Sequence, residues 1–251
     1  MNDYILETEG LGLRYGAFAA LGSVDLKIRR GSIHTVIGPN GAGKTTLFHC
    51  LTGERKPSSG NIQFAGTNIT SQAAHKRVAA GMSRSFQITS LFQNLSVHEN
   101  LRLAAQGRDG LGALSFWYSD QHRREHSDKA DEVIERIKLG AVADTCAGEL
   151  SHGQQRVLEV GMALCSNPQM LLLDEPTSGM GVDDIPVMTQ LIAELGRDHT
   201  VMLIEHNMRL VMSISDRITV MHQGNILIEG DPDEVSGDKR VKKAYLGESG
   251  S

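Results

Sequence analysis

One stretch of the sequence has the residue types and the spacing of a phosphate-binding loop. Residues 38–45 read GPNGAGKT and match the pattern G-x-x-x-x-G-K-[ST] in full. Glycines let the backbone wrap closely around phosphates, and consecutive N–H groups at a helix start form a concave anion site. We therefore predict nucleotide binding by this loop, whose residues are Gly38, Pro39, Asn40, Gly41, Ala42, Gly43, Lys44, Thr45 and Thr46. Lys44 is expected to reach the β- and γ-phosphates, and the Thr45 hydroxyl to ligate Mg²⁺.

A pair of carboxylates follows an apolar run later in the chain. Residues 170–179 read MLLLDEPTSG, which is typical of a buried strand that ends in Asp174 and Glu175. Asp174 is expected to hold Mg²⁺, directly or through water, and Glu175 to orient or deprotonate the attacking water. The alternative is an ordinary strand with an acidic turn. The phosphate loop upstream favours the functional interpretation.

Three single residues have a possible role in the same site. His206 follows the apolar run VMLIE, and the carboxyl ends of strands in an open α/β sheet form the usual ligand edge. It could contact the γ-phosphate or the attacking water, although such a histidine is more often structural. Gln87 could bridge Mg²⁺ and water, or solvate a loop. Tyr15 could stack on a base, or pack in the core as a strand residue.

A second glycine-centred motif, LSHGQQR at residues 150–156, precedes the helix-like run RVLEVGMAL. Ser151 and Gln154 predict a capping box, in which the serine caps the helix and the glutamine reaches back. Capping does not explain Gly153, which costs helix stability but frees N–H groups at the helix start. Such a helix start is a second anion site. We therefore predict a head-to-tail dimer in which each phosphate loop receives this motif from the other subunit.

The elements that must position these residues alternate between strands and helices. Continuous apolar runs at 33–37, 170–173 and 201–204 indicate strands of a parallel sheet covered on both faces. The segment GNIQFAGTNI predicts a hairpin. A helical pattern runs from about 97 to 150, with apolar residues at Ala130, Val133, Ile134 and Ile137, and is broken by a loop insertion at 107–122.

These patterns predict an α/β fold in three parts. Residues 1–87 and 159–230 are expected to form a nucleotide-binding core with a mainly parallel sheet and antiparallel N-terminal strands. Residues 88–158 are expected to form a helical insertion, and residues 231–251 a C-terminal segment.

Composition excludes several classes of protein. The chain has 251 residues with 25 Lys and Arg against 30 Asp and Glu, so it lacks the basic footprint of a nucleic-acid binder. Its apolar runs are strand-length, well short of the roughly 20 residues that span a bilayer. The N-terminus does not resemble a secretory signal. Cys50, Cys146 and Cys165 are scattered and predict reduced thiols in a cytosolic protein.

The ordered set GPNGAGKTT, RSFQ, LSHGQQR, LLLDEP and LIEHN resembles the ATP-binding-cassette (ABC) ATPases over nearly the whole chain. The resemblance implies that Ser151, Gly153 and Gln154 face the γ-phosphate of the partner's ATP. It also implies that Gln87 and His206 act at the γ-phosphate side, and that Tyr15 stacks on adenine. His152 departs from the commoner glycine. Gly181 stands where the family usually has an aspartate, which places cross-dimer signalling in doubt; Asp183 or Asp184 is a possible substitute.

Within the family, the chain looks most like ATP-binding subunits of branched-chain or hydrophobic amino-acid importers. The segments that carry this resemblance include IGPNGAGKTTLFHCLTG, RSFQITSLFQNLSVHENL, LIEHNMRLVMSISDRI and the ending KAYLGE. The resemblance implies a second ATPase subunit, permease subunits, a separate solute-binding protein, and a location on the inner face of the plasma membrane. Import of urea or another small amide, and a non-transport ABC ATPase, are the alternatives.

Aromatic residues predict where a permease would dock. Five of the eleven aromatics fall between 86 and 118. Phe86 is expected to be core, whereas Phe92 and the cluster Phe116, Trp117 and Tyr118 lie in segments with loop signals and are expected to anchor a permease helix. A metal site at His122 and His126 is a weak alternative to a solvated loop, because no third ligand is evident.

Overall fold

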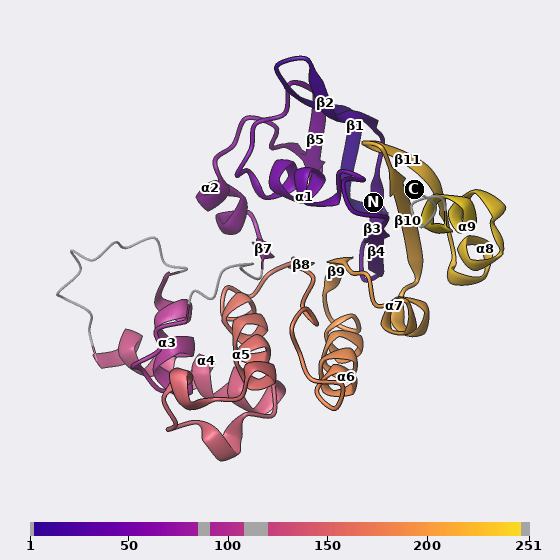
Figure 1. The fold of residues 1–251 in the computed structure, drawn as a ribbon. Helices are drawn as coiled ribbons and strands as arrows, with labels where there is room; N and C mark the ends of the chain where they lie inside the picture. Colours follow the sequence, from indigo (N-terminus) through magenta and orange to yellow (C-terminus); the bar gives the residue numbers. More distant parts are fainter. Residues whose placement is uncertain (1–2, 85–90, 108–119, 247–251) are drawn as a thin grey trace.

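The computed structural model describes residues 3–84, 91–107 and 120–246, which form two sheets and surrounding helices (Figure 1). The larger sheet has the strand order β11-β10-β4-β9-β8-β7. Its five strands from β10 to β7 are parallel, and β11 pairs antiparallel at the edge. The strands are β4 (Ile33–Ile37), β7 (Met82–Arg84), β8 (Met170–Asp174), β9 (Thr200–Ile204), β10 (Arg217–His222) and β11 (Asn225–Gly230).

Both faces of the larger sheet are buried, which explains its continuous apolar runs. Along β8, Leu171 and Leu173 join the core on one face, and Met170 and Leu172 join the core on the other. Side chains alternate between faces along a strand, so a strand covered on both sides must be apolar at every position. The predicted parallel α/β sheet is confirmed.

The smaller sheet is antiparallel. It has the order β2-β1-β5-β6, with β3 also paired to β1. The predicted hairpin at GNIQFAGTNI is confirmed, because β5 and β6 pair through Phe64 and Thr67. The strands are β1 (Tyr4–Tyr15), β2 (Phe18–Val24), β3 (Lys27–Arg29), β5 (Ser59–Phe64) and β6 (Thr67–Asn68).

Helices cover the sheets and form a separate group on one side (Figure 1). Helix α1 (Lys44–Thr52) packs in the core between the two sheets. Ala130, Val133, Ile134 and Ile137 are all buried, as their spacing predicts. The other helices are α2 (Ala74–Ala79), α3 (Val97–Gly107), α4 (Asp120–Arg136), α5 (His152–Leu164), α6 (Ile185–Leu195), α7 (Met208–Ile214), α8 (Pro232–Gly237) and α9 (Lys239–Leu246), with short 3₁₀ turns η1 (Gly140–Val142) and η2 (Ala147–Glu149).

Two predicted segment boundaries can be compared with the observed helices. The insertion expected at 107–122 lies mostly outside the described residues, and α4 already begins at Asp120. The expected boundary between residues 158 and 159 falls inside α5, because this helix packs on α3 and α4 and also on the sheet. The division into parts therefore stays a prediction.

Two expectations from composition can be compared with the described residues. None of their helices combines the length and apolar character needed to cross a membrane. All three cysteines are unpaired, as expected, and burial raises the pKa of the Cys50 thiol to about 11 and that of Cys165 to about 12.

Candidate functional site

The phosphate loop joins the end of β4 to the start of α1, in the strand–loop–helix order that the motif requires. Gly41 and Gly43 have φ of 77° and 102°, a region that favours glycine. The buried Lys44 ammonium donates to the Gly38 and Pro39 carbonyls at 2.7 and 3.2 Å. The loop borders a cavity of about 250 Å³ lined by Phe18, Ala20, Asn40, Gly41, Ala42, Gly43, Lys44, Thr45, Thr46 and Glu175.

Asp174 is a buried carboxylate with an unsatisfied oxygen. Its Oδ2 has no hydrogen-bond partner in the described part of the chain. Burial, then the charge of Glu175, raises the pKa of Asp174 to about 6, and Lys44 opposes this shift. A buried polar atom without a partner calls for an unseen ligand such as water or an ion. The carboxylate therefore fits the Mg²⁺ role predicted for it, and Thr45, the other predicted ligand, lines the phosphate-loop cavity beside Glu175, the residue that follows Asp174.

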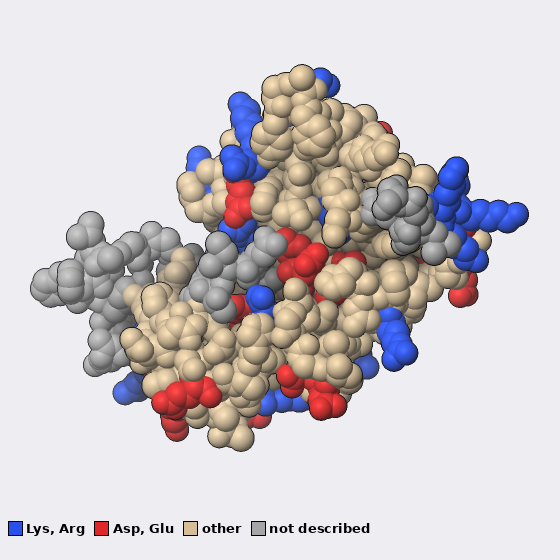
Figure 2. Space-filling view, in the orientation of Figure 1, with Lys and Arg blue, Asp and Glu red and all other residues tan. Residues whose placement is uncertain are grey.

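The structure brings Glu175 and His206 together, although 31 positions separate them in the chain. His206 Nδ1 lies 3.8 Å from Glu175 Oε1, and Glu175 also lines the phosphate-loop cavity. Glu175 has a φ of 48°, which is uncommon for a non-glycine residue and costs free energy. Acidic side chains gather in the hollow between α1 and β8 on the face shown in Figure 2. This arrangement can hold a water molecule beside a bound phosphate.

Glu205 is a residue of this site that sequence reasoning missed. It is fully buried, and its Oε1 accepts hydrogen bonds from the Thr177 amide and hydroxyl. Its Oε2 accepts from the His206 and Asn207 amides at 2.9 and 3.1 Å. One carboxylate therefore ties the loop after Glu175 to the segment that carries His206. In the sequence, Glu205 could have been noticed as the charged residue that ends the apolar run VMLIE.

We expect Glu205→Gln to slow nucleotide hydrolysis about tenfold or more, with nucleotide affinity nearly unchanged. The amide nitrogen of glutamine must face N–H donors wherever it points, and hydrogen bonds to a charged group contribute about 1.5–3 kcal/mol. Steady-state phosphate release and nucleotide titration separate the two effects. Glu132→Gln, on the exposed face of α4, is the matched control. An unchanged turnover in a folded Glu205→Gln protein would contradict this role.

The helix start at Ser151 forms the predicted capping box. Ser151 Oγ accepts the Gln154 amide at 3.2 Å, and Gln154 Oε1 accepts the Ser151 amide at 3.0 Å. A steric constraint also favours glycine at position 153, because a Cβ there would lie 2.5 Å from Asp184 Cγ. The proposed role of these three residues at a partner's ATP stays a prediction.

The loop that contains Gly181 packs against the same helix start. The Asp184 carboxylate lies over Gly153, and a Cβ at Gly179 would lie 3.2 Å from the His152 ring. Asp184, one of the two candidates to replace the missing aspartate, therefore contacts the LSHGQQR motif within its own chain.

The other predicted residues have mixed outcomes. Tyr15 is 49% exposed, so the core alternative is wrong, yet it does not line the cavity. Its partner across the β1–β2 hairpin, Phe18, does line it and is 67% exposed. Gln87 lies outside the described residues, as does the side chain of His122. Among the described residues, no group of three or more His, Cys, Asp or Glu is placed to hold a metal ion.

The C-terminal segment reaches the phosphate loop. Tyr245 in α9 packs on a cluster that contains Ile37, the last residue of β4. Burial raises the pKa of the Tyr245 phenol, and the Gly38 backbone amide opposes this shift as a hydrogen-bond donor. The predicted C-terminal segment thus contacts the core where the nucleotide would bind.

Comparison with known protein families gives two matches. The model described as "ABC transporter" matches residues 21–178. The model described as "Branched-chain amino acid ATP-binding cassette transporter" matches residues 227–250, the segment that includes Tyr245.

Individual proteins match over nearly their whole length. The chain is 39% identical to the high-affinity branched-chain amino acid transport ATP-binding protein BraF of Pseudomonas aeruginosa, covering 99% of this chain and 100% of BraF. It is 40% identical to the corresponding protein LivG of Salmonella typhimurium, with the same coverage. Among solved structures, the ADP conformation of MJ1267, an ATP-binding cassette of an ABC transporter, has a TM-score of 0.86 and 32% identity, covering 97% of this chain and 99% of MJ1267.

Proposed function

Because this chain belongs to the ABC transporter ATPase family, we propose that it powers uptake of branched-chain or other hydrophobic amino acids through a membrane permease. The observation that carries the ATPase part is the meeting of Glu175 and His206 beside the phosphate-loop cavity. The cargo is supported by the family match at residues 227–250 and by the named relatives.

The site residues have separate roles in ATP hydrolysis. Lys44 and the loop amides bind the β- and γ-phosphates, and Glu175 accepts a proton from the attacking water while His206 helps to orient it. Thr45, Asp174 and, by resemblance, Gln87 would hold Mg²⁺, which supplies charge neutralisation at the phosphates. The hydrolysis rate is therefore expected to depend on Glu175, and nucleotide binding on Lys44.

The transport part requires partners. A second ATPase subunit would contribute Ser151, Gly153 and Gln154 to each ATP, and permease subunits would receive the closing motion. In this assembly the chain lies at the inner face of the plasma membrane, and a solute-binding protein delivers cargo on the other side.

Phe92 is the best-defined anchor for a permease in the described part of the chain. Its side chain is 53% exposed, whereas its backbone is tied to the buried Asn100, whose side chain accepts the Phe92 amide at 2.8 Å and donates to its carbonyl at 3.1 Å. An exposed ring on a fixed backbone is suited to an interface hot spot. Phe86 and the cluster at 116–118 lie outside the described residues.

We expect Phe92→Ala to reduce ATP-driven uptake at least tenfold while leaving the melting temperature and ATP affinity of the isolated chain nearly unchanged. Truncating a hot spot costs 2 kcal/mol or more of binding free energy, whereas the Asn100 contacts to the backbone persist. Val78→Ala, which trims an exposed side chain on α2, is the control. Unfolding of Phe92→Ala, or full uptake by it, would place the docking surface elsewhere.

The cargo is tested in vesicles that contain this chain together with the permease subunits and the solute-binding protein of its transporter. ATP-dependent accumulation of leucine, isoleucine or valine is the expected result. If urea or another small amide accumulates instead, that solute is the cargo, and the assignment of the chain as an ATPase is unaffected.

A further inference from the structure

The C-terminal helix α9 packs beside the phosphate loop, although it is the last element of the chain that the structure describes. Its residues Val241 and Ala244 are buried, whereas its basic side chains are exposed. Val241 and Tyr245 join a cluster that contains Ile37, the last residue of β4, and residues of β10. In Figure 1, α9 lies beside β10 and β11. The inner face of α9 therefore packs with the strand that leads into the phosphate loop.

Tyr245 extends this packing onto the loop itself. Its side chain is half-buried, and its hydroxyl accepts a hydrogen bond from the amide of Gly38, the first residue of the loop. Burial raises the pKa of the Tyr245 phenol above its ordinary value, so the hydroxyl is neutral at physiological pH. Because the Gly38 amide donates to Tyr245, it anchors the start of the loop to the C-terminal helix.

Gly38 is held from two further directions. A Cβ at this position would clash with the Met221 carbonyl oxygen of β10, so the backbone of the loop lies directly against that strand. The Gly38 carbonyl accepts a hydrogen bond from Lys44 Nζ at 2.7 Å. Three contacts thus fix the first residue of the loop, and they come from β10, from Lys44 and from Tyr245.

The Lys44 contact must change when a nucleotide binds. The Lys44 ammonium has three N–H donors, and it uses two of them on the Gly38 and Pro39 carbonyls. Contacts to both the β- and the γ-phosphate need two donors, so Lys44 must release at least one of these carbonyls. When the Gly38 carbonyl is released, the Tyr245 hydroxyl still holds the amide of the same residue.

We propose that Tyr245 is a positioning residue of the nucleotide site, and that its hydroxyl fixes the start of the phosphate loop while Lys44 turns to the phosphates. Donors that are already in place bind more tightly than donors that must first be ordered. The nucleotide affinity of the loop therefore depends on a residue of the C-terminal helix. This inference rests on nucleotide binding at the phosphate loop, as the proposed function does.

Tyr245→Phe tests this role, because phenylalanine keeps the ring that packs near Ile37 and removes only the hydroxyl. We expect the dissociation constants of ATP and of inorganic tripolyphosphate to rise about three- to tenfold, as for the loss of one hydrogen bond. Tripolyphosphate has no base, so an equal change for both ligands places the effect at the phosphates. Tyr245 does not line the cavity beside Glu175, so KM should rise while kcat at saturating ATP stays nearly unchanged.

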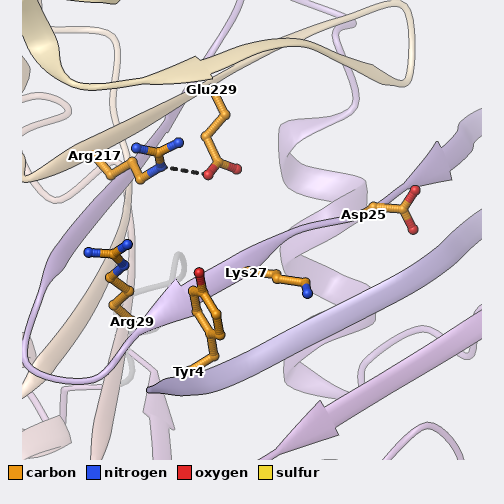
Figure 3. Close-up of a pocket in the computed structure, with 6 residues that line it drawn as sticks. All are labelled: Tyr4, Asp25, Lys27, Arg29, Arg217 and Glu229. Atoms are coloured by element: carbon orange, nitrogen blue, oxygen red, sulfur yellow. Dashed lines mark hydrogen bonds and ion pairs between the residues drawn. The ribbon is translucent and has the colours of Figure 1, made fainter. Parts of the chain in front are cut away.

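Tyr4→Phe is the matched control, because it also removes the hydroxyl of a half-buried tyrosine. Tyr4 lines a separate charged cavity with Arg217 and Glu229 (Figure 3), and that cavity shares no residue with the phosphate-loop cavity. This substitution should leave both affinities unchanged. Equal weakening by the two substitutions, or unchanged affinities in folded Tyr245→Phe, would overturn the role of Tyr245. An unsubstituted chain that binds neither ligand would overturn the nucleotide site and the proposed function with it.

Hydrogen exchange at the Gly38 amide is an independent measurement, and it uses the unsubstituted chain. We expect this amide to be protected both without nucleotide and with ATP bound, because Tyr245 retains it when Lys44 moves. Faster exchange of the Gly38 amide after ATP binding would show that Tyr245 releases the loop, and would overturn the proposal.

Discussion

Replacing Glu175 by glutamine should leave ATP bound and reduce its hydrolysis by at least two orders of magnitude. A general base contributes about 10²–10⁴-fold to a rate, and an amide cannot accept the proton of the attacking water. The phosphate cradle is unaffected, because its contacts come from the loop and from Lys44. Glutamine has the same shape, so the backbone at φ of 48° need not change.

The measurement combines single-turnover phosphate release with ATP titration of the same protein. Glu132→Gln is the control for loss of one carboxylate. A Glu175→Gln protein that turns over at near the normal rate would assign the base to another residue. His206→Ala should also slow hydrolysis, but if His206 only orients the water, its effect should be smaller than that of Glu175→Gln.

A dimer that pairs one Lys44→Ala subunit with one Ser151→Arg subunit should retain one intact ATP site. If each ATP lies between Lys44 of one subunit and Ser151 of the other, both lesions fall on the same composite site. Lys44→Ala alone, in both subunits, should strongly weaken nucleotide binding, because charge-assisted contacts to phosphate are lost. Nucleotide occupancy per dimer and ATP-dependent dimerisation report the result.

The structure adds a control to this experiment. Ser151 caps α5, so Ser151→Arg also removes a cap, which costs about 1 kcal/mol. Ser151→Thr keeps a capping hydroxyl and should retain both the helix start and the site. Equal damage at both sites of the mixed dimer would contradict the shared-site model, whereas damage in Ser151→Thr would point to helix capping instead.

The sequence alone determined the parts that depend on neighbouring residues. The phosphate loop, the capping box at Ser151 and the hairpin at GNIQFAGTNI each form within a few consecutive positions, so local residue types specify them. The buried strands could also be predicted from the sequence, because a strand covered on both faces must be apolar throughout. Asp174 and Glu175 could be named as candidate site residues because they lie at the end of such a strand.

Contacts between distant segments were decided by the tertiary structure. Asp174 lies opposite Ile204 in the register of β8 and β9, which brings Glu175 and Glu205 to the same sheet edge and His206 within 3.8 Å of Glu175. Periodicity indicates that two strands exist but carries no information about their register, which depends on packing over the whole sheet. For the same reason, only the folded chain shows the role of Glu205 and the place of Phe18 at the phosphate-loop cavity. The approach of Asp184 to Gly153 and of Tyr245 to Gly38 is likewise a property of the tertiary structure.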